Sequence, residues 1–89
     1  MNIIIEKPNQ KKLDILDVYN WSIWSCEKSV FDWEYNDNEV CFLLEGEVEV
    51  KTEDGKVFNF AKGDMVSFPK GLKCIWNVKK AVRKHYKFG

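Results

Sequence analysis

From residue 21 to its C-terminal end, the sequence alternates between short runs of strand-forming residues and turn signals, and this pattern constrains the fold more than any other feature. The turn signal "EDGK" carries Asp54-Gly55, a strong hairpin mark, and "AKGD" at 61–64 is another. About eight short strands at near-even spacing are typical of a β-sandwich or a small β-barrel. We therefore predict an all-β domain. The runs are 21–29, 30–35, 39–45, 47–52, 56–61, 65–69, 72–78 and 81–88.

One helix is expected before the strands, in "PNQKKLDILDVYN". Asn9 follows a proline and can cap the first turn through its side chain. Leu13, Leu16 and Tyr19 recur at helical spacing, which predicts that they share one face.

The length of 89 residues corresponds to one domain with a single core. We expect a single domain over 1–89, with an N-terminal strand and helix in 1–20 and the barrel in 21–89.

Composition argues against several classes of partner. Lys plus Arg and Asp plus Glu both number 14, so no net basic field is available to hold nucleic acid or an anionic membrane. No segment approaches the roughly 20 apolar residues of a membrane helix, so a soluble, cytoplasmic protein is expected. Cys26, Cys41 and Cys74 are an odd number without zinc-site spacing, and we expect reduced thiols.

Two spacings in the β-rich region resemble the signature motifs of the cupin superfamily. Glu39 is followed by six residues and then Gly46, and Gly63 is followed by five residues and then Pro69. The match covers about 33–78, and the chain looks most like the small single-domain cupins grouped with the (S)-ureidoglycine aminohydrolase cupin domain. The resemblance implies a cupin-like jelly-roll barrel, also called a double-stranded β-helix, in which Gly46 is expected at a chain reversal with positive φ.

The resemblance does not extend to the metal ligands. Most metal-binding cupins carry two histidines before the motif glutamate and a third after the second motif glycine. Trp33, Tyr35 and Cys74 stand at those positions here, and Glu39 alone matches the ligand set. A transition metal generally needs several imidazole or thiolate donors. We therefore predict neither a cofactor nor a metal site of the usual cupin kind.

Strand alternation predicts which side chains share the interior with Glu39, which the resemblance places facing inward. On the last strand Lys84 lies on the same face as Tyr86, while Trp21 and Trp24 are interpreted as core filler. The interior is either a filled core or a narrow aromatic pocket. The residues predicted to bind a ligand are Trp33, Tyr35, Glu39, Cys41, Cys74, Trp76, Lys84 and Tyr86.

Glu39 raises the central question, because a carboxylate buried without a partner costs several kcal/mol. Lys84 is the best candidate partner, since it is the one basic residue on the otherwise apolar face of the last strand.

Three functional hypotheses remain open. The first is a small-molecule-binding cupin without the usual metal. The second is an enzyme related to ureidoglycine aminohydrolase, or to other small-molecule cupin enzymes, with a non-standard metal site or none; no catalytic residue is assigned. The third is a structural or regulatory scaffold. We also expect a homodimer, because the outward set Val40, Phe42 and Leu44 is apolar and needs a cover.

Overall fold

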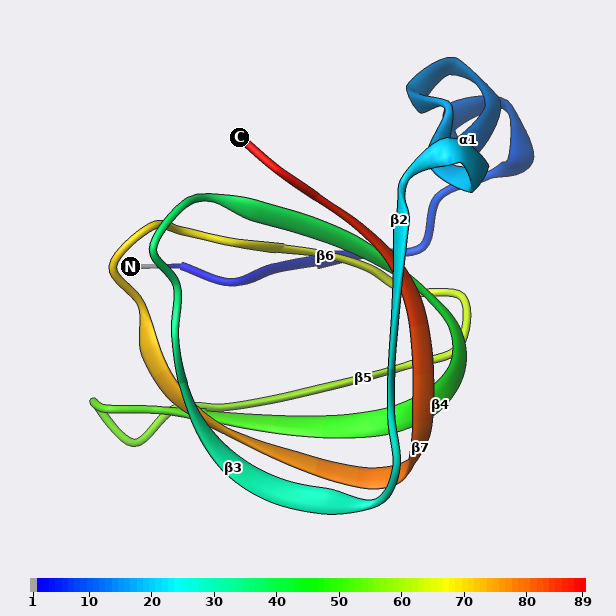
Figure 1. The fold of residues 1–89 in the computed structure, drawn as a ribbon. Helices are drawn as coiled ribbons and strands as arrows, with labels where there is room; N and C mark the ends of the chain where they lie inside the picture. Colours follow the sequence, from blue (N-terminus) through cyan, green and yellow to red (C-terminus); the bar gives the residue numbers. More distant parts are fainter. Residues whose placement is uncertain (1) are drawn as a thin grey trace.

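The computed structural model describes residues 2–89; Met1, part of the predicted N-terminal segment, lies outside the described residues. The strands form one seven-stranded antiparallel sheet in the order β1-β6-β4-β7-β2, with β3 paired to β7 and β5 to β4. The sheet curves round an interior, and helix α1 lies outside it (Figure 1). The elements are β1 (Ile4–Glu6), α1 (Gln10–Leu16), the 3-10 turn η1 (Val18–Asn20), β2 (Ser22–Cys26), β3 (Ser29–Glu34), β4 (Glu39–Thr52), β5 (Val57–Ala61), β6 (Met65–Phe68) and β7 (Lys73–Phe88).

Two long strands replace four of the predicted short ones. Runs 39–45 and 47–52 join into β4, and runs 72–78 and 81–88 join into β7. The two strands pair along almost their whole length, with register shifts between Leu43 and Val48. Such irregularities bend a strand and increase its twist. The interior is therefore enclosed by two long, bent strands, and not by the four short strands that the sequence predicted.

Gly46 has the expected positive φ, at 107°, but it lies at the bend inside β4 and not at a chain reversal. A Cβ added there would lie 2.6 Å from the carbonyl oxygen of Ala81 and 2.8 Å from the Cα of Val82. Both the backbone conformation and the close approach of β7 therefore require glycine at this position.

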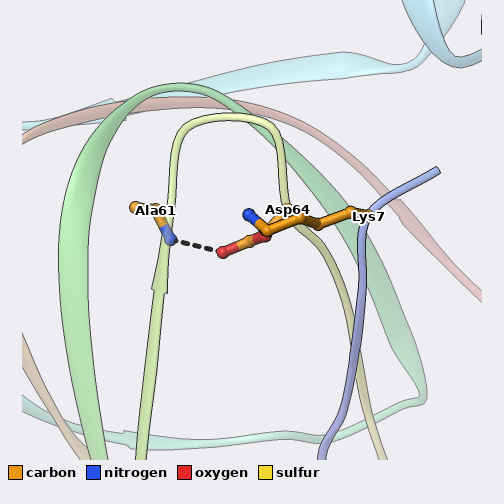
Figure 2. Close-up of polar contacts among 3 residues, drawn as sticks. All are labelled: Lys7, Ala61 and Asp64. Carbon is orange, nitrogen blue, oxygen red and sulfur yellow. Dashed lines mark hydrogen bonds and ion pairs between the residues drawn. The ribbon is translucent and has the colours of Figure 1, made fainter. Parts of the chain in front are cut away.

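The "AKGD" signal correctly predicts a turn between β5 and β6, and Asp64 organises this turn. The Ala61 amide donates to Asp64 Oδ2 at 2.9 Å, and Lys7 Nζ lies 2.7 Å from Asp64 Oδ1 (Figure 2). The carboxylate of Asp64 is nearly buried while Lys7 is exposed. This contact ties the segment after β1 to the barrel.

Helix α1 covers part of the outer face of β4. Asn9 caps it by accepting a hydrogen bond from the Lys12 amide at 2.9 Å, as predicted. The helix ends where Asp17 adopts a left-handed conformation, with φ 57°. Of the three residues predicted to share one face, Leu13 is buried, whereas Leu16 and Tyr19 are 38% and 51% exposed. Tyr19 lies beyond the end of the helix, in η1. Within residues 2–89, no helix has the length and apolar character that crossing a membrane requires.

The apolar set that suggested a homodimer is covered within the chain. Phe42 packs in a cluster with Leu13, Val18 and Met65, and Val40 and Leu44 pack against this cluster. Contrary to the expectation from the sequence, β4 needs no second subunit to cover this face, because the N-terminal segment supplies the cover. The homodimer itself stays a prediction.

We expect Gly46→Ala to lower the free energy of unfolding by about 2 kcal/mol or more, because the change adds left-handed strain and a collision with the backbone of β7. Gly55→Ala is the matched control, since Gly55 also has positive φ, at 82°, but has nothing within 4 Å of an added Cβ. Urea denaturation measures both. Equal losses in the two variants would show that the approach of β7 to Gly46 does not constrain the fold.

Candidate functional site

An ion pair lies inside the barrel, between the start of β4 and the last part of β7. Lys84 Nζ donates to Glu39 Oε2 at 2.7 Å, and the two side chains are 6% and 5% exposed. Lys84 is opposite Leu43 in the register of the strands, so its side chain extends along the inner face to reach Glu39. The predicted partnership of Glu39 with Lys84 is confirmed.

Aromatic rings surround the ammonium group of Lys84. Its Nζ lies 4.8 Å from the ring centre of Trp76, 5.1 Å from that of Trp24 and 5.8 Å from that of Tyr86. Ring faces attract a cation most strongly where water is excluded. The rings therefore offset part of the cost of removing this charge from water.

Tyr35 adds a hydroxyl to this environment. Trp76 Nε1 donates to the Tyr35 hydroxyl at 3.1 Å, and the Tyr35 ring stacks on Phe68 with centres 4.6 Å apart. The backbone of Tyr35 is held by hydrogen bonds with Leu72 and Gly71. Burial, and then the nearby charge of Glu39, raise the pKa of Tyr35 far above its usual range, so the hydroxyl stays protonated.

A cavity of about 140 Å³ opens beside the ion pair. Glu39 and Lys84 form its buried polar part, whereas Trp33 and Phe88 are 47% and 53% exposed and form its rim. The interior is therefore a narrow aromatic pocket, the second of the two alternatives left open by the sequence. Its lining residues are Trp24, Phe31, Trp33, Tyr35, Glu39, Trp76, Lys84, Tyr86 and Phe88.

Six of the eight residues predicted to bind a ligand line this cavity: Trp33, Tyr35, Glu39, Trp76, Lys84 and Tyr86. The other two are cysteines that lie elsewhere. Cys41 is fully buried in the core, and Cys74 is also part of the core but borders a separate surface groove together with Thr52 and Ile75.

Three lining residues were missed by the sequence analysis. Trp24 is opposite Lys84 in the β2–β7 pairing, and Phe31 is opposite Trp76 in the β3–β7 pairing. These non-local registers are not visible in the sequence. Phe88 could have been predicted from the sequence, because it follows Lys84 and Tyr86 at alternate positions and so lies on the same face of a strand.

The thiols of Cys41 and Cys74 are poor nucleophiles at neutral pH. Burial raises the pKa of Cys41 to about 12, an effect that the charge of Lys84 partly opposes. Burial also raises the pKa of Cys74 to about 11. Both sulfurs therefore remain protonated and act as small apolar groups.

The residues at the cupin ligand positions do not fit a transition metal. Glu39 is already paired with Lys84, and Cys74 faces a different groove. Across the described residues, no three His, Cys, Asp or Glu side chains are grouped closely enough to hold a metal ion. The ammonium of Lys84 supplies the positive charge next to Glu39.

The bent antiparallel barrel, with the motif glycine at its bend and the motif glutamate inside, defines a small cupin. The chain belongs to the EutQ-like cupin domain family, whose model matches residues 13–86.

Solved structures support this assignment. A DUF861 family protein from Thermotoga maritima is 55% identical, with a TM-score of 0.98, and the match covers 99% of this chain and all of that one. A DUF861 family protein from Pseudomonas syringae is 28% identical, with a TM-score of 0.66, over 72% of this chain and 28% of that one.

The EutQ protein of Clostridium difficile shares the fold, with 23% identity and a TM-score of 0.66. The match covers 72% of this chain and half of the EutQ chain. A search of curated proteins found no match.

A double-mutant cycle tests the ion pair. We expect Lys84→Met alone to lower the free energy of unfolding by about 3 kcal/mol, because it leaves the Glu39 carboxylate buried without its partner. Adding Glu39→Gln should restore part of this loss. Chemical denaturation of the wild type, the two single variants and the double variant gives the interaction free energy between the two side chains. Strictly additive losses would mean that the two side chains do not depend on each other.

Proposed function

We propose that this cupin binds a small polar organic molecule in the cavity beside the Glu39–Lys84 pair, without a metal. The observation that carries the proposal is the position of the pair: two buried, opposite charges face a cavity whose other walls are almost wholly aromatic. Ligand sites are typically apolar cavities with a few polar groups that fix orientation.

The cavity limits the size of the ligand. An apolar cavity of about 150 Å³ in another protein takes up benzene, so a volume of about 140 Å³ here suits roughly six to eight non-hydrogen atoms. A larger ligand would have to extend past the rim residues Trp33 and Phe88.

The charges limit its chemistry. An ammonium has three N–H donors and an ionised carboxylate has only acceptors, so the pair offers both roles side by side with no net charge. The pair therefore favours a neutral or zwitterionic molecule that carries an acceptor next to a donor. Flat faces on the ligand would pack against Trp76 and Tyr86, as aromatic side chains favour stacked and edge contacts.

An enzymatic role related to ureidoglycine aminohydrolase is a second candidate. Glu39 is retained at the motif position and has a proton donor 2.7 Å away in Lys84. A carboxylate next to a proton donor is suited to general acid–base catalysis. Because the metal ligands do not fit, such a reaction would use these two side chains alone. Turnover of ureidoglycine by the wild type, lost in Glu39→Gln, would favour this candidate over simple binding.

A thermal-shift screen tests the binding proposal. The probes are small amino acids, amides, ureides and lactams. At about one hundred times its Kd, a ligand stabilises the folded state by about 2.7 kcal/mol, which raises Tm by roughly 15 °C in a domain of this size. We expect at least one compound to raise Tm in the wild type but not in Glu39→Gln.

Glu47→Gln is the matched control, because Glu47 also lies on β4 and pairs with a β7 lysine, but on the surface. It should respond like the wild type. If no compound shifts Tm at millimolar concentration, or if the shifts persist in a folded Glu39→Gln, the cavity is not a ligand site.

A further inference from the structure

We propose that Lys84 is a nucleophile that forms an imine with small aldehydes or ketones admitted to the cavity. The inference rests on the proposed binding site and adds the carbonyl class of substrate to it. It does not depend on the identity of a physiological ligand, because any carbonyl compound that fits can report the reaction.

The position of Lys84 distinguishes it from the other lysines. Among residues 2–89, it is the one lysine that is buried, and its side chain is part of the cavity wall. Other lysines of the same strand, such as Lys79 and Lys80, form surface ion pairs with Glu49 and Glu47. Lysines that form Schiff bases are activated by removal from water or by a neighbouring cation, and Lys84 shares the first of these features because it is buried among aromatic rings.

Glu39 supplies the acid–base partner that the reaction needs. The ammonium first transfers a proton to Glu39 Oε2, 2.7 Å away, which leaves a neutral amine and a carboxylic acid. The nitrogen lone pair then forms a bond to the carbonyl carbon, and the oxygen takes up the proton that the nitrogen loses, which gives a carbinolamine.

Loss of water completes the step. The C–O bond breaks, the Glu39 carboxylic acid returns its proton to the departing hydroxyl, and the nitrogen lone pair forms the C=N bond. The net reaction converts one ammonium and one carbonyl compound into one protonated imine and one water. The reaction involves no oxidation or reduction, and the carboxylate of Glu39 is regenerated.

The surroundings of Lys84 suit the product as well as the reactant. The protonated imine carries the same single positive charge as the ammonium, so it keeps its attraction to Glu39 and to the ring faces of Trp24 and Trp76. The mostly aromatic wall also limits the access of water that would hydrolyse the imine.

Reductive trapping of the full-length wild-type protein tests the proposal. The protein is incubated with propanal and cyanoborohydride at neutral pH, and N-propyl lysines are quantified by peptide mapping. Lys80 is the matched control, because it lies on β7 and pairs with a β4 glutamate 3.6 Å away, but is 71% exposed. Since a positioned acid–base group contributes on the order of 10²-fold, we expect labelling of Lys84 to exceed that of Lys80 by about tenfold or more.

Two further measurements make the test specific to the cavity. A bulky aldehyde such as pyrenecarboxaldehyde should reverse the preference, because it does not fit the cavity. Glu39→Gln, with its fold checked by circular dichroism, should reduce labelling of Lys84 to the level of Lys80, while Glu47→Gln should leave it unchanged.

Labelling of Lys84 at or below the rate of Lys80 in the wild type overturns the proposal and needs no variant to be informative. Labelling that exceeds Lys80 but persists in folded Glu39→Gln overturns it too. If metabolites without a carbonyl group still raise Tm in the screen above, the binding function stands and only the imine chemistry is rejected.

Discussion

The buried ion pair between Glu39 and Lys84 is the interaction on which the interior of this small cupin depends. Removing either charge from water costs several kcal/mol, and a domain of this kind is stable by only about 5–15 kcal/mol. The pair is sustained because the two charges meet at 2.7 Å and the ammonium lies over aromatic rings. The two side chains carry no net charge together, and their polar atoms line a cavity. This is the basis of the proposed binding function.

The fold places these groups through two long strands rather than through a loop. Inward alternation along β4 and β7 puts Glu39 and Lys84 on the same inner face, and the bend at Gly46 allows β4 and β7 to enclose that face. Helix α1 then covers the outer face around Phe42. A site carried on paired strands is held by the hydrogen bonds of the sheet, and this rigidity suits a small cavity in which ring positions decide what can enter.

Much of this arrangement could be predicted from sequence. Motif spacing indicated the cupin barrel, and the period-two pattern identified Lys84 as the partner of Glu39. Trp24 and Phe31 were missed because their places at the cavity depend on how β2 and β3 pair with β7, which is a non-local choice. Cys74 was expected at the cavity because alternation along the strand predicts an inward side chain. It lies near the start of β7, however, where the adjoining groove is a different one. The cover provided by α1 was also invisible, since local patterns do not show which surface a helix meets.

The ammonium of Lys84, 2.7 Å from Glu39, is the positive charge that this carboxylate binds. The most direct test is a crystal structure of the wild-type protein grown with excess zinc or manganese, with anomalous data collected at the metal edge. We expect Lys84 Nζ within hydrogen-bonding distance of Glu39 and no anomalous peak beside that carboxylate. A metal ion bound to Glu39, with Lys84 displaced from it, would show that the ion pair is not the stable partner of this carboxylate.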